Sequence, residues 1–347
     1  MTRRRRLDGG GQRAEVPALP APGAGVVLAV DGGNSKTDLA LVDSEGGVLA
    51  FAHGPLSSPH HIGEDGCMRV LEQLVEEAEL DGRVASVATL CMAGVDFPSE
   101  EERLAELVDA RGWAKQTTVL NDTFAVLRAG TEQGWGVAVV CGAGINCVGV
   151  APDGRHTRFP ALGAITGDWG GGFDVGLTAL SKAARSLDGR GPKTTLEQAV
   201  PAHFGFATPY ELAEAIHRKE IAELRMLELA PIVFAEAEGD HEAAEIVDRL
   251  AAEIVALAGT ALARLGLETT AVEVLLGGGL LRDEDSRVVE SIREGLRERA
   301  PAVSVRVTGT PPIVGATLLA LDSVGASPAA QERVREEVMA AAGVTDG

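Results

Sequence analysis

The chain has 347 residues, 45% of them hydrophobic, which is enough to bury a sizeable core. At the usual length of roughly 100 to 200 residues per domain, it should form about two domains. Its 51 acidic and 31 basic residues give a net charge of -20, which disfavours a polyanion and argues against a nucleic-acid partner. The four cysteines are too few and too widely spaced for a disulfide framework, and no apolar run of about 18 residues offers a membrane span. We therefore expect a globular protein of the reducing cytoplasm with no membrane partner.

Residues 1–24 include basic residues like those of a signal peptide, but no apolar segment follows them. We expect these residues to form a disordered tail.

After residue 24, short apolar and β-branched runs alternate with longer segments of helical periodicity. The first half predicts a three-stranded meander followed by alternating helices and strands. The predicted strands are 25–33, 36–47, 48–54, 84–94 and 117–122, and the predicted helices are 64–80, 99–112 and 123–130.

The second half begins with the same order of strand, glycine-rich bend, strand, turn and strand, at 135–159, about 110 residues after its first occurrence. Two copies of one supersecondary unit predict a duplicated α/β architecture. The predicted helices are then 173–187, 194–203, 209–218, 240–265, 284–299 and 313–321, and the predicted strands are 272–279 and 303–309.

Three glycine-rich bends follow apolar strands, with the sequences DGGNSK at 31–36, CGAGIN at 141–146 and LGGGLL at 276–281. A single bend of this kind often only closes a hairpin, because glycine adopts positive φ without strain. Main-chain N–H groups at such bends also form concave sites for phosphate oxygens. None of the three matches GxxxxGK[ST] or the GxGxxG that opens a Rossmann helix, so we expect another nucleotide-binding fold.

The order of these motifs resembles the actin-like ATPase superfamily of sugar kinases, heat-shock ATPases and actin. Within it, residues 25–322 resemble the N-acetylglucosamine kinase branch of the BadF/BadG/BcrA/BcrD ATPase family, and LDGRGPKTTLEQAVPAHFG at 187–205 also looks like a family segment. The other motifs that carry the resemblance are VDGGNSKTDLALVD, LNDTFAVL, VVCGAGINCVGV, GDWGGGFDVG, LLGGGLL and PPIVGATLLAL.

The resemblance implies an α/β fold with duplicated ribonuclease H-like (actin-like ATPase) domains and an interdomain cleft. The expected segments are the tail at 1–24, an N-terminal domain at 25–130 joined by a helix at about 311–322, a C-terminal domain at 131–310, and a helical extension at 323–347.

The resemblance also implies ATP and Mg2+ as cofactors, with Asp31 holding the metal through water. The residues expected to contact the nucleotide are Gly32, Gly33, Asn34, Ser35, Lys36, Gly142, Ala143, Gly144, Gly277, Gly278 and Gly279. Asp122 is expected to be the catalytic base. The residues expected to bind a small-molecule sugar are Asn146, Asp168, Gly94 and His60.

General chemistry supports the roles expected for Asp31, Asp122 and Asp168. Phosphoryl transfer needs positioning, a metal and a carboxylate near the sugar hydroxyl. Asp31, Asp122 and Asp168 each stand beside a strand end or a glycine-rich bend. Structural roles stay open for two of them. Asp122 could instead cap the helix that follows it, and Asp168 could stabilise its own loop.

Some residues depart from the family pattern. Ala143 replaces a common hydroxyl residue, Pro59 stands where sugar-binding relatives often carry Asn, and no Gly-Trp pair precedes Asp168. The acceptor is therefore N-acetylglucosamine, glucosamine or another hexose. The adjacent His60 and His61 suit a loop or substrate rim better than a zinc site, because no Cys or carboxylate stands at ligand spacing beside them.

The leading hypothesis is an ATP-dependent kinase for the 6-hydroxyl of an amino sugar, forming a homodimer. One alternative is an ATPase activator of a 2-hydroxyacyl-CoA dehydratase or benzoyl-CoA reductase system, which would need cysteines for an iron-sulfur cluster. The other is a non-catalytic sugar sensor.

Overall fold

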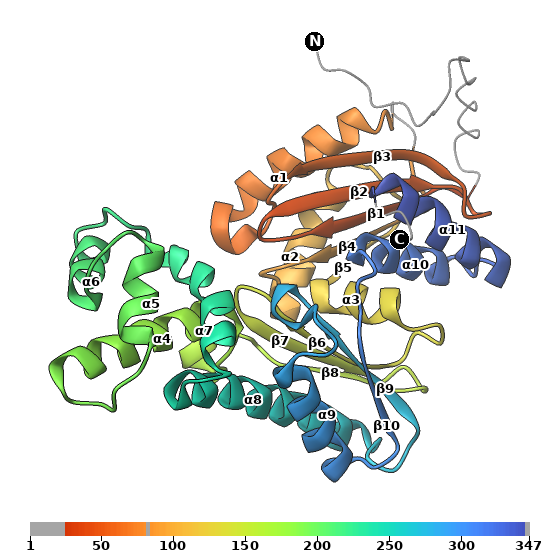
Figure 1. The fold of residues 1–347 in the computed structure, drawn as a ribbon. Helices are drawn as coiled ribbons and strands as arrows, with labels where there is room; N and C mark the ends of the chain where they lie inside the picture. Colours follow the sequence, from red (N-terminus) through yellow and green to blue (C-terminus); the bar gives the residue numbers. More distant parts are fainter. Residues whose placement is uncertain (1–24, 81–83, 344–347) are drawn as a thin grey trace, which may run out of the picture. The chain divides into compact units, whose positions relative to one another are not determined.

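The structure is a computed structural model that describes residues 25–80 and 84–343 (Figure 1). The predicted tail at 1–24 lies outside these residues. The chain divides into two compact units. Unit 1 contains the described residues up to Glu132 and those from Thr310 onward, and unit 2 contains Gln133–Gly309.

Within the described residues, unit 1 contains one five-stranded sheet with the strand order β3-β2-β1-β4-β5. The first three strands form the predicted antiparallel meander, and β4 and β5 add in parallel beside β1. The strands are β1 (Val27–Gly32), β2 (Lys36–Val42), β3 (Val48–Pro55), β4 (Val87–Met92) and β5 (Thr117–Asn121).

The described part of unit 2 contains a second five-stranded sheet, with the order β10-β9-β6-β7-β8. Here β6, β7 and β8 form an antiparallel meander, and β9 and β10 add in parallel beside β6. Both mixed sheets therefore have the same order and strand directions. The strands are β6 (Gly136–Cys141), β7 (Ile145–Val150), β8 (His156–Arg158), β9 (Val272–Gly277) and β10 (Val303–Val307).

The helices of unit 1 cover both faces of its sheet. They are α1 (Pro59–Glu77), α2 (Pro98–Asp109), α3 (Asp122–Gly130), α10 (Pro312–Ser323) and α11 (Pro328–Ala341). Helices α10 and α11, blue in Figure 1, come from the end of the chain and lie beside the red strands of its beginning. Helix α11 lies within residues 323–347, for which a helical extension was predicted.

Alternation along β1 directs its side chains to two different cores. Leu28 and Val30 pack with residues of α1 and α2, whereas Val27 and Ala29 pack with residues of α3 and α10. Asp31 continues the second series and so belongs to the face that α3 and α10 cover.

Unit 2 is built around α8, a 25-residue helix that packs on β6, β7 and α9. The 3-10 segment 223–229 and α7 were not predicted, because short apolar runs lack a clear helical period. The helices are α4 (Gly171–Asp188), α5 (Leu196–His203), α6 (Pro209–His217), α7 (Ala230–Glu236), α8 (His241–Leu265) and α9 (Arg287–Arg299). Among the described residues, no helix combines the length and apolarity needed to cross a membrane.

Candidate active site

Asp31 lies near the end of β1, and only 8% of its surface is exposed. Its neighbours across the sheet are Asp38 on β2 and Cys91 on β4. The pKa of Asp31 rises from its ordinary 3.8 to about 8, first because the carboxyl group is buried and then because Asp122 and Asp38 repel its charge. Lys36 opposes this rise only in part. The residues predicted to hold the metal and to act as the base therefore interact with each other.

Asp122 is the first residue of α3, directly after β5. The helix cap is its neighbour Asn121, whose side-chain oxygen accepts hydrogen bonds from the N–H and the hydroxyl of Thr123. The N-cap residue of α3 is therefore Asn121 and not Asp122. Burial raises the pKa of Asp122 to about 6, although the N–H groups of Thr123 and of Asp122 itself work against the rise. A carboxyl group with this pKa can exchange a proton near neutral pH.

Asn121 also ties the start of α3 to the loop after β4. Its side-chain NH2 group donates to the carbonyl oxygen of Val95 at 3.1 Å and to Oδ1 of Asp96 at 3.0 Å. Asn121 is 2% exposed, so these bonds are protected from water. Sequence reasoning missed this residue, because an Asn before a helix indicates a cap but not a partner 26 residues away.

Gly94 and His60, both predicted to bind sugar, lie next to each other. A Cβ atom on Gly94 would come within 2.8 Å of Cβ of His60 and within 2.5 Å of Oγ of Ser58, so this contact requires glycine. His60 and His61 lie in the first turn of α1 rather than in the predicted loop. The helix begins at Pro59, earlier than predicted, and the non-helical Gly63 separates this turn from the rest of α1.

Lys36 pairs with an acidic residue that sequence reasoning did not select. Its Nζ lies 2.8 Å from Oδ2 of Asp38, and Nδ1 of His53 lies 2.6 Å from the other oxygen. Asp38 is 2% exposed and stands opposite Asp31 in the β1–β2 register. The tight hairpin could have predicted this pairing, because a short turn fixes the register of its strands.

The first glycine-rich bend has exposed residues at its tip. A Cβ atom on Gly32 would lie 2.5 Å from Cε of Met92, so a side chain here would have to displace the end of the Met92 side chain. The N–H of Ser57 donates to the carbonyl of Gly33 at 3.3 Å. Since C=O and N–H point in opposite directions in a trans peptide, the N–H of Asn34 points away from Ser57. Asn34 and the residue after it are exposed, so an anion can reach this bend.

The second bend docks on the first turn of α4. The N–H groups of Gly172 and Phe173 donate to the carbonyl oxygens of Gly142 and Ala143, at 2.8 and 3.1 Å. By the same peptide geometry, the N–H groups of Ala143 and Gly144 point away from the helix. Both residues are exposed. Two outward N–H groups in a row can form a backbone anion site without a hydroxyl side chain at Ala143.

The third bend lies against the second. Gly278 has φ +95, and a Cβ atom on it would lie 2.2 Å from the carbonyl oxygen of Cys141. Glycine is therefore required here, and its neighbour Gly277 pairs with Val140 near the end of β6. Cys141 and Cys147 are buried in the core of unit 2.

Asp168 and Asn146 each make a local hydrogen bond. The hydroxyl of Thr166 donates to Oδ2 of Asp168, and the N–H of Asp168 donates to the carbonyl of Gly163. Asp168 thus stabilises its own loop, as one of the two alternatives predicted. The residue is partly exposed. Oδ1 of Asn146 accepts from the N–H of Cys147 at 2.7 Å.

The chain belongs to the BadF/BadG/BcrA/BcrD ATPase family, whose sequence pattern matches residues 28–320. It is 27% identical over 313 residues to an N-acetyl-D-glucosamine kinase from Dictyostelium discoideum, covering 86% of this chain and 98% of the relative. It is 25% identical over 299 residues to an N-acetylmuramic acid/N-acetylglucosamine kinase from Clostridium acetobutylicum, covering 85% and 97% of the two chains.

Solved structures share the fold. A candidate N-acetylglucosamine kinase from Chromobacterium violaceum aligns with a TM-score of 0.63 at 24% identity, over 86% of this chain and 99% of the other. A ROK family transcriptional regulator, a homologue of the E. coli MLC protein, aligns with a TM-score of 0.55 at 14% identity, over 91% and 82% of the two chains. The same fold thus occurs in proteins described as a kinase and as a regulator.

The raised pKa of Asp31 predicts how stability depends on pH in the protein without nucleotide or metal. Because the folded state holds this proton more tightly than the unfolded state, the stabilisation is complete below pH 3.8 and is lost as pH rises through 8. Between pH 6.5 and 8 the free energy of unfolding should fall by on the order of 1 kcal/mol per pH unit. Asp31→Asn should flatten this fall in urea titrations, and the exposed Asp109→Asn should not. An equal slope in wild type and Asp31→Asn would contradict the assignment.

Proposed function

We propose that the protein is an ATP-dependent kinase that phosphorylates the 6-hydroxyl of an amino sugar, N-acetylglucosamine or glucosamine. The observation that carries this proposal is the pair of interacting carboxyl groups of Asp31 and Asp122, next to a glycine-rich bend with exposed N–H groups. The relatives described as N-acetylglucosamine kinases support the substrate class.

Asp122 would accept the proton of the sugar hydroxyl. A pKa of about 6 leaves the group ionised at neutral pH, yet close enough to that pH to take up a proton during transfer. In a loose transition state the hydroxyl proton leaves late, so the orientation of this carboxylate matters as much as its basicity. Gly94 and His60 in unit 1, and Asn146 and Asp168 in unit 2, are proposed to bind the sugar.

A divalent cation fits the carboxylates of unit 1. Asp122 and Asp38 repel the charge of the buried Asp31, and Mg2+ with its oxygen ligands and water would relieve this repulsion. We propose that Asp31 holds Mg2+ through water, and that the metal offsets charge on the phosphates when ATP is bound. Lys36 is already paired with Asp38, so its contribution to phosphate binding would be shared with that carboxylate.

The nucleotide is proposed to bind through the backbone. The N–H groups of Asn34, Ala143 and Gly144 would contact phosphate oxygens, and the third bend at 277–279 would receive the adenosine, where a side chain would block close approach. The matching order of the two sheets supports a duplicated ribonuclease H-like origin for the two units. The homodimer and the cytoplasmic location stay predictions.

Neither alternative function gains equal support. An iron-sulfur activator needs accessible thiolates, but all four cysteines are buried, and burial raises the pKa of Cys67 and of Cys141 to about 12. A non-catalytic sensor would share the fold of the ROK regulator, which is evidence of fold alone.

The proposal predicts sugar-dependent release of ADP from ATP and Mg2+ by the purified full chain. N-acetylglucosamine and glucosamine should be the best acceptors in a panel that includes glucose and N-acetylmannosamine, and mass spectrometry should place the phosphate on the 6-hydroxyl. Excess EDTA should abolish turnover. Tight sugar binding by calorimetry without any turnover would favour the sensor, and a visible iron chromophore after anaerobic reconstitution would favour the activator.

Asp122→Asn should retain the fold and the nucleotide affinity but lower kcat by on the order of 10²-fold, the scale of general base catalysis. The amide has nearly the same shape as the carboxylate but cannot accept the proton. Asp109→Asn makes the same change on an exposed helix and should leave kcat unchanged. A kcat for Asp122→Asn close to that of wild type would remove Asp122 from the mechanism.

A further inference from the structure

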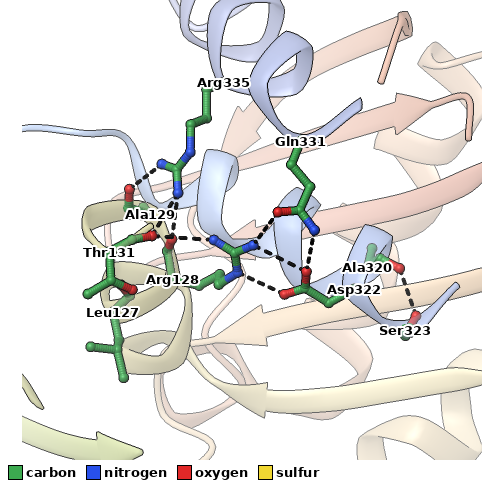
Figure 2. Close-up of polar contacts among 9 residues, drawn as sticks. All are labelled: Leu127, Arg128, Ala129, Thr131, Ala320, Asp322, Ser323, Gln331 and Arg335. Carbon is green, nitrogen blue, oxygen red and sulfur yellow. Dashed lines mark hydrogen bonds and ion pairs between the residues drawn. The ribbon is translucent and has the colours of Figure 1, made fainter. Parts of the chain in front are cut away.

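Helix α11 holds the C-terminal end of α3, the helix that begins with Asp122 (Figure 2). The guanidinium of Arg335 donates to the carbonyl oxygens of Ala129 at 2.6 Å, Thr131 at 2.7 Å and Arg128 at 3.4 Å. The last carbonyl groups of a helix have no partner within it, and a positive charge there is favourable to the helix dipole. Arg335 therefore caps α3 from a helix more than 200 residues later in the chain.

Arg128 ties α3 to α10 and α11 from its own side. It is 4% exposed, and its guanidinium donates to both carboxylate oxygens of Asp322, at 2.7 and 3.2 Å. It also donates to Oε1 of Gln331 at 3.0 Å, and Gln331 in turn donates to Asp322 at 2.9 Å. Figure 2 shows these bonds as one closed network between the end of α10, α11 and α3. A forked guanidinium-carboxylate pair of this kind fixes orientation as well as distance.

Close packing also fixes the middle of α3. A Cβ atom on Gly315 of α10 would lie 1.8 Å from the carbonyl oxygen of Ala125, so the two helix backbones are in direct contact at this point. Asn121 anchors the other end of α3 to the loop after β4. A helix of nine residues is only about 13 Å long, so a tilt at its C-terminal end is transmitted to its first residue.

We propose that Arg335 and Arg128 are positioning residues that hold α3 so that Asp122 stays in place for phosphoryl transfer. Helix α11 follows the residues 28–320 that the family pattern matches. Under this proposal it helps to position the candidate catalytic base of unit 1. The proposal rests on the proposed function, in which Asp122 is the base. Neither arginine contacts the reacting groups, and both act through α3.

The test compares Arg335→Ala with Arg335→Lys and with Arg333→Ala, a control on the same helix whose guanidinium pairs with Glu337. Arg335→Ala should lower kcat about tenfold at a temperature where it is fully folded, because displacements of an ångström can cost ~10²-fold. Its KM for ATP should stay within about twofold, since α3 carries none of the glycine-rich bends. Arg335→Lys keeps a donor and the charge, so it should recover part of kcat. Arg333→Ala should match wild type.

Hydrogen exchange gives a readout that does not depend on turnover. In Arg335→Ala the amides of residues 125–130 should exchange faster, while those of β1 and β4 keep the protection they have in wild type. If the wild-type chain phosphorylates no sugar, the proposed function fails and this exchange pattern alone decides whether Arg335 holds α3. Unchanged exchange in α3 would overturn the proposal, and so would a kcat equal to that of wild type or a loss of kcat matched by Arg333→Ala.

Discussion

The repulsion between buried carboxyl groups at the ends of β1 and β5 is the constraint on which the candidate site depends. Asp31 is 8% exposed, Asp38 lies opposite it, and Asp122 begins the next helix. Holding these groups together out of water costs free energy, which appears as the raised pKa values of Asp31 and Asp122. A metal cation and a transferable proton are the two partners that relieve such a cluster, and a kinase uses both. The costly grouping of these three carboxyl groups is therefore the feature that supports the proposed function.

The surrounding helices keep the cluster in place despite its repulsion. One face of β1 packs on α10 and α3, where Gly315 allows direct contact between the two backbones. The network around Arg128 and Arg335 then holds the far end of α3. Helix α11 lies after residue 320, outside the range that the family pattern matches. It thus supports α3, which lies inside that range. In unit 2, hydrogen bonds from α4 fix the second bend without any charged side chain.

The sequence predicted the elements whose signals are local. The meander, the parallel strands and the glycine-rich bends follow from alternation and from glycine placement, and the structure contains them. The roles of Asp31 and Asp122 came from family resemblance, and their interaction adds a physical reason for them. The partners that lie far apart in sequence were missed. Asp38 beside Asp31 depends on hairpin register, and Arg335 reaches Ala129 across 206 residues. No periodicity encodes such contacts, because they arise only when the helices and strands have packed.

The most direct test is a carboxyl carbon-13 NMR titration of the aspartates in the protein without nucleotide or metal, with Asp122→Asn as the comparison. The account predicts that Asp31 and Asp122 titrate as a coupled pair, with apparent pKa values of about 8 and 6. Replacing Asp122 by Asn should lower the apparent pKa of Asp31, because one of the charges that repel the Asp31 carboxylate is gone. Addition of Mg2+ with a nucleotide should shift both titrations to lower pH. Titration of both groups near 4, with Asp31 unaffected by Asp122→Asn, would contradict the account.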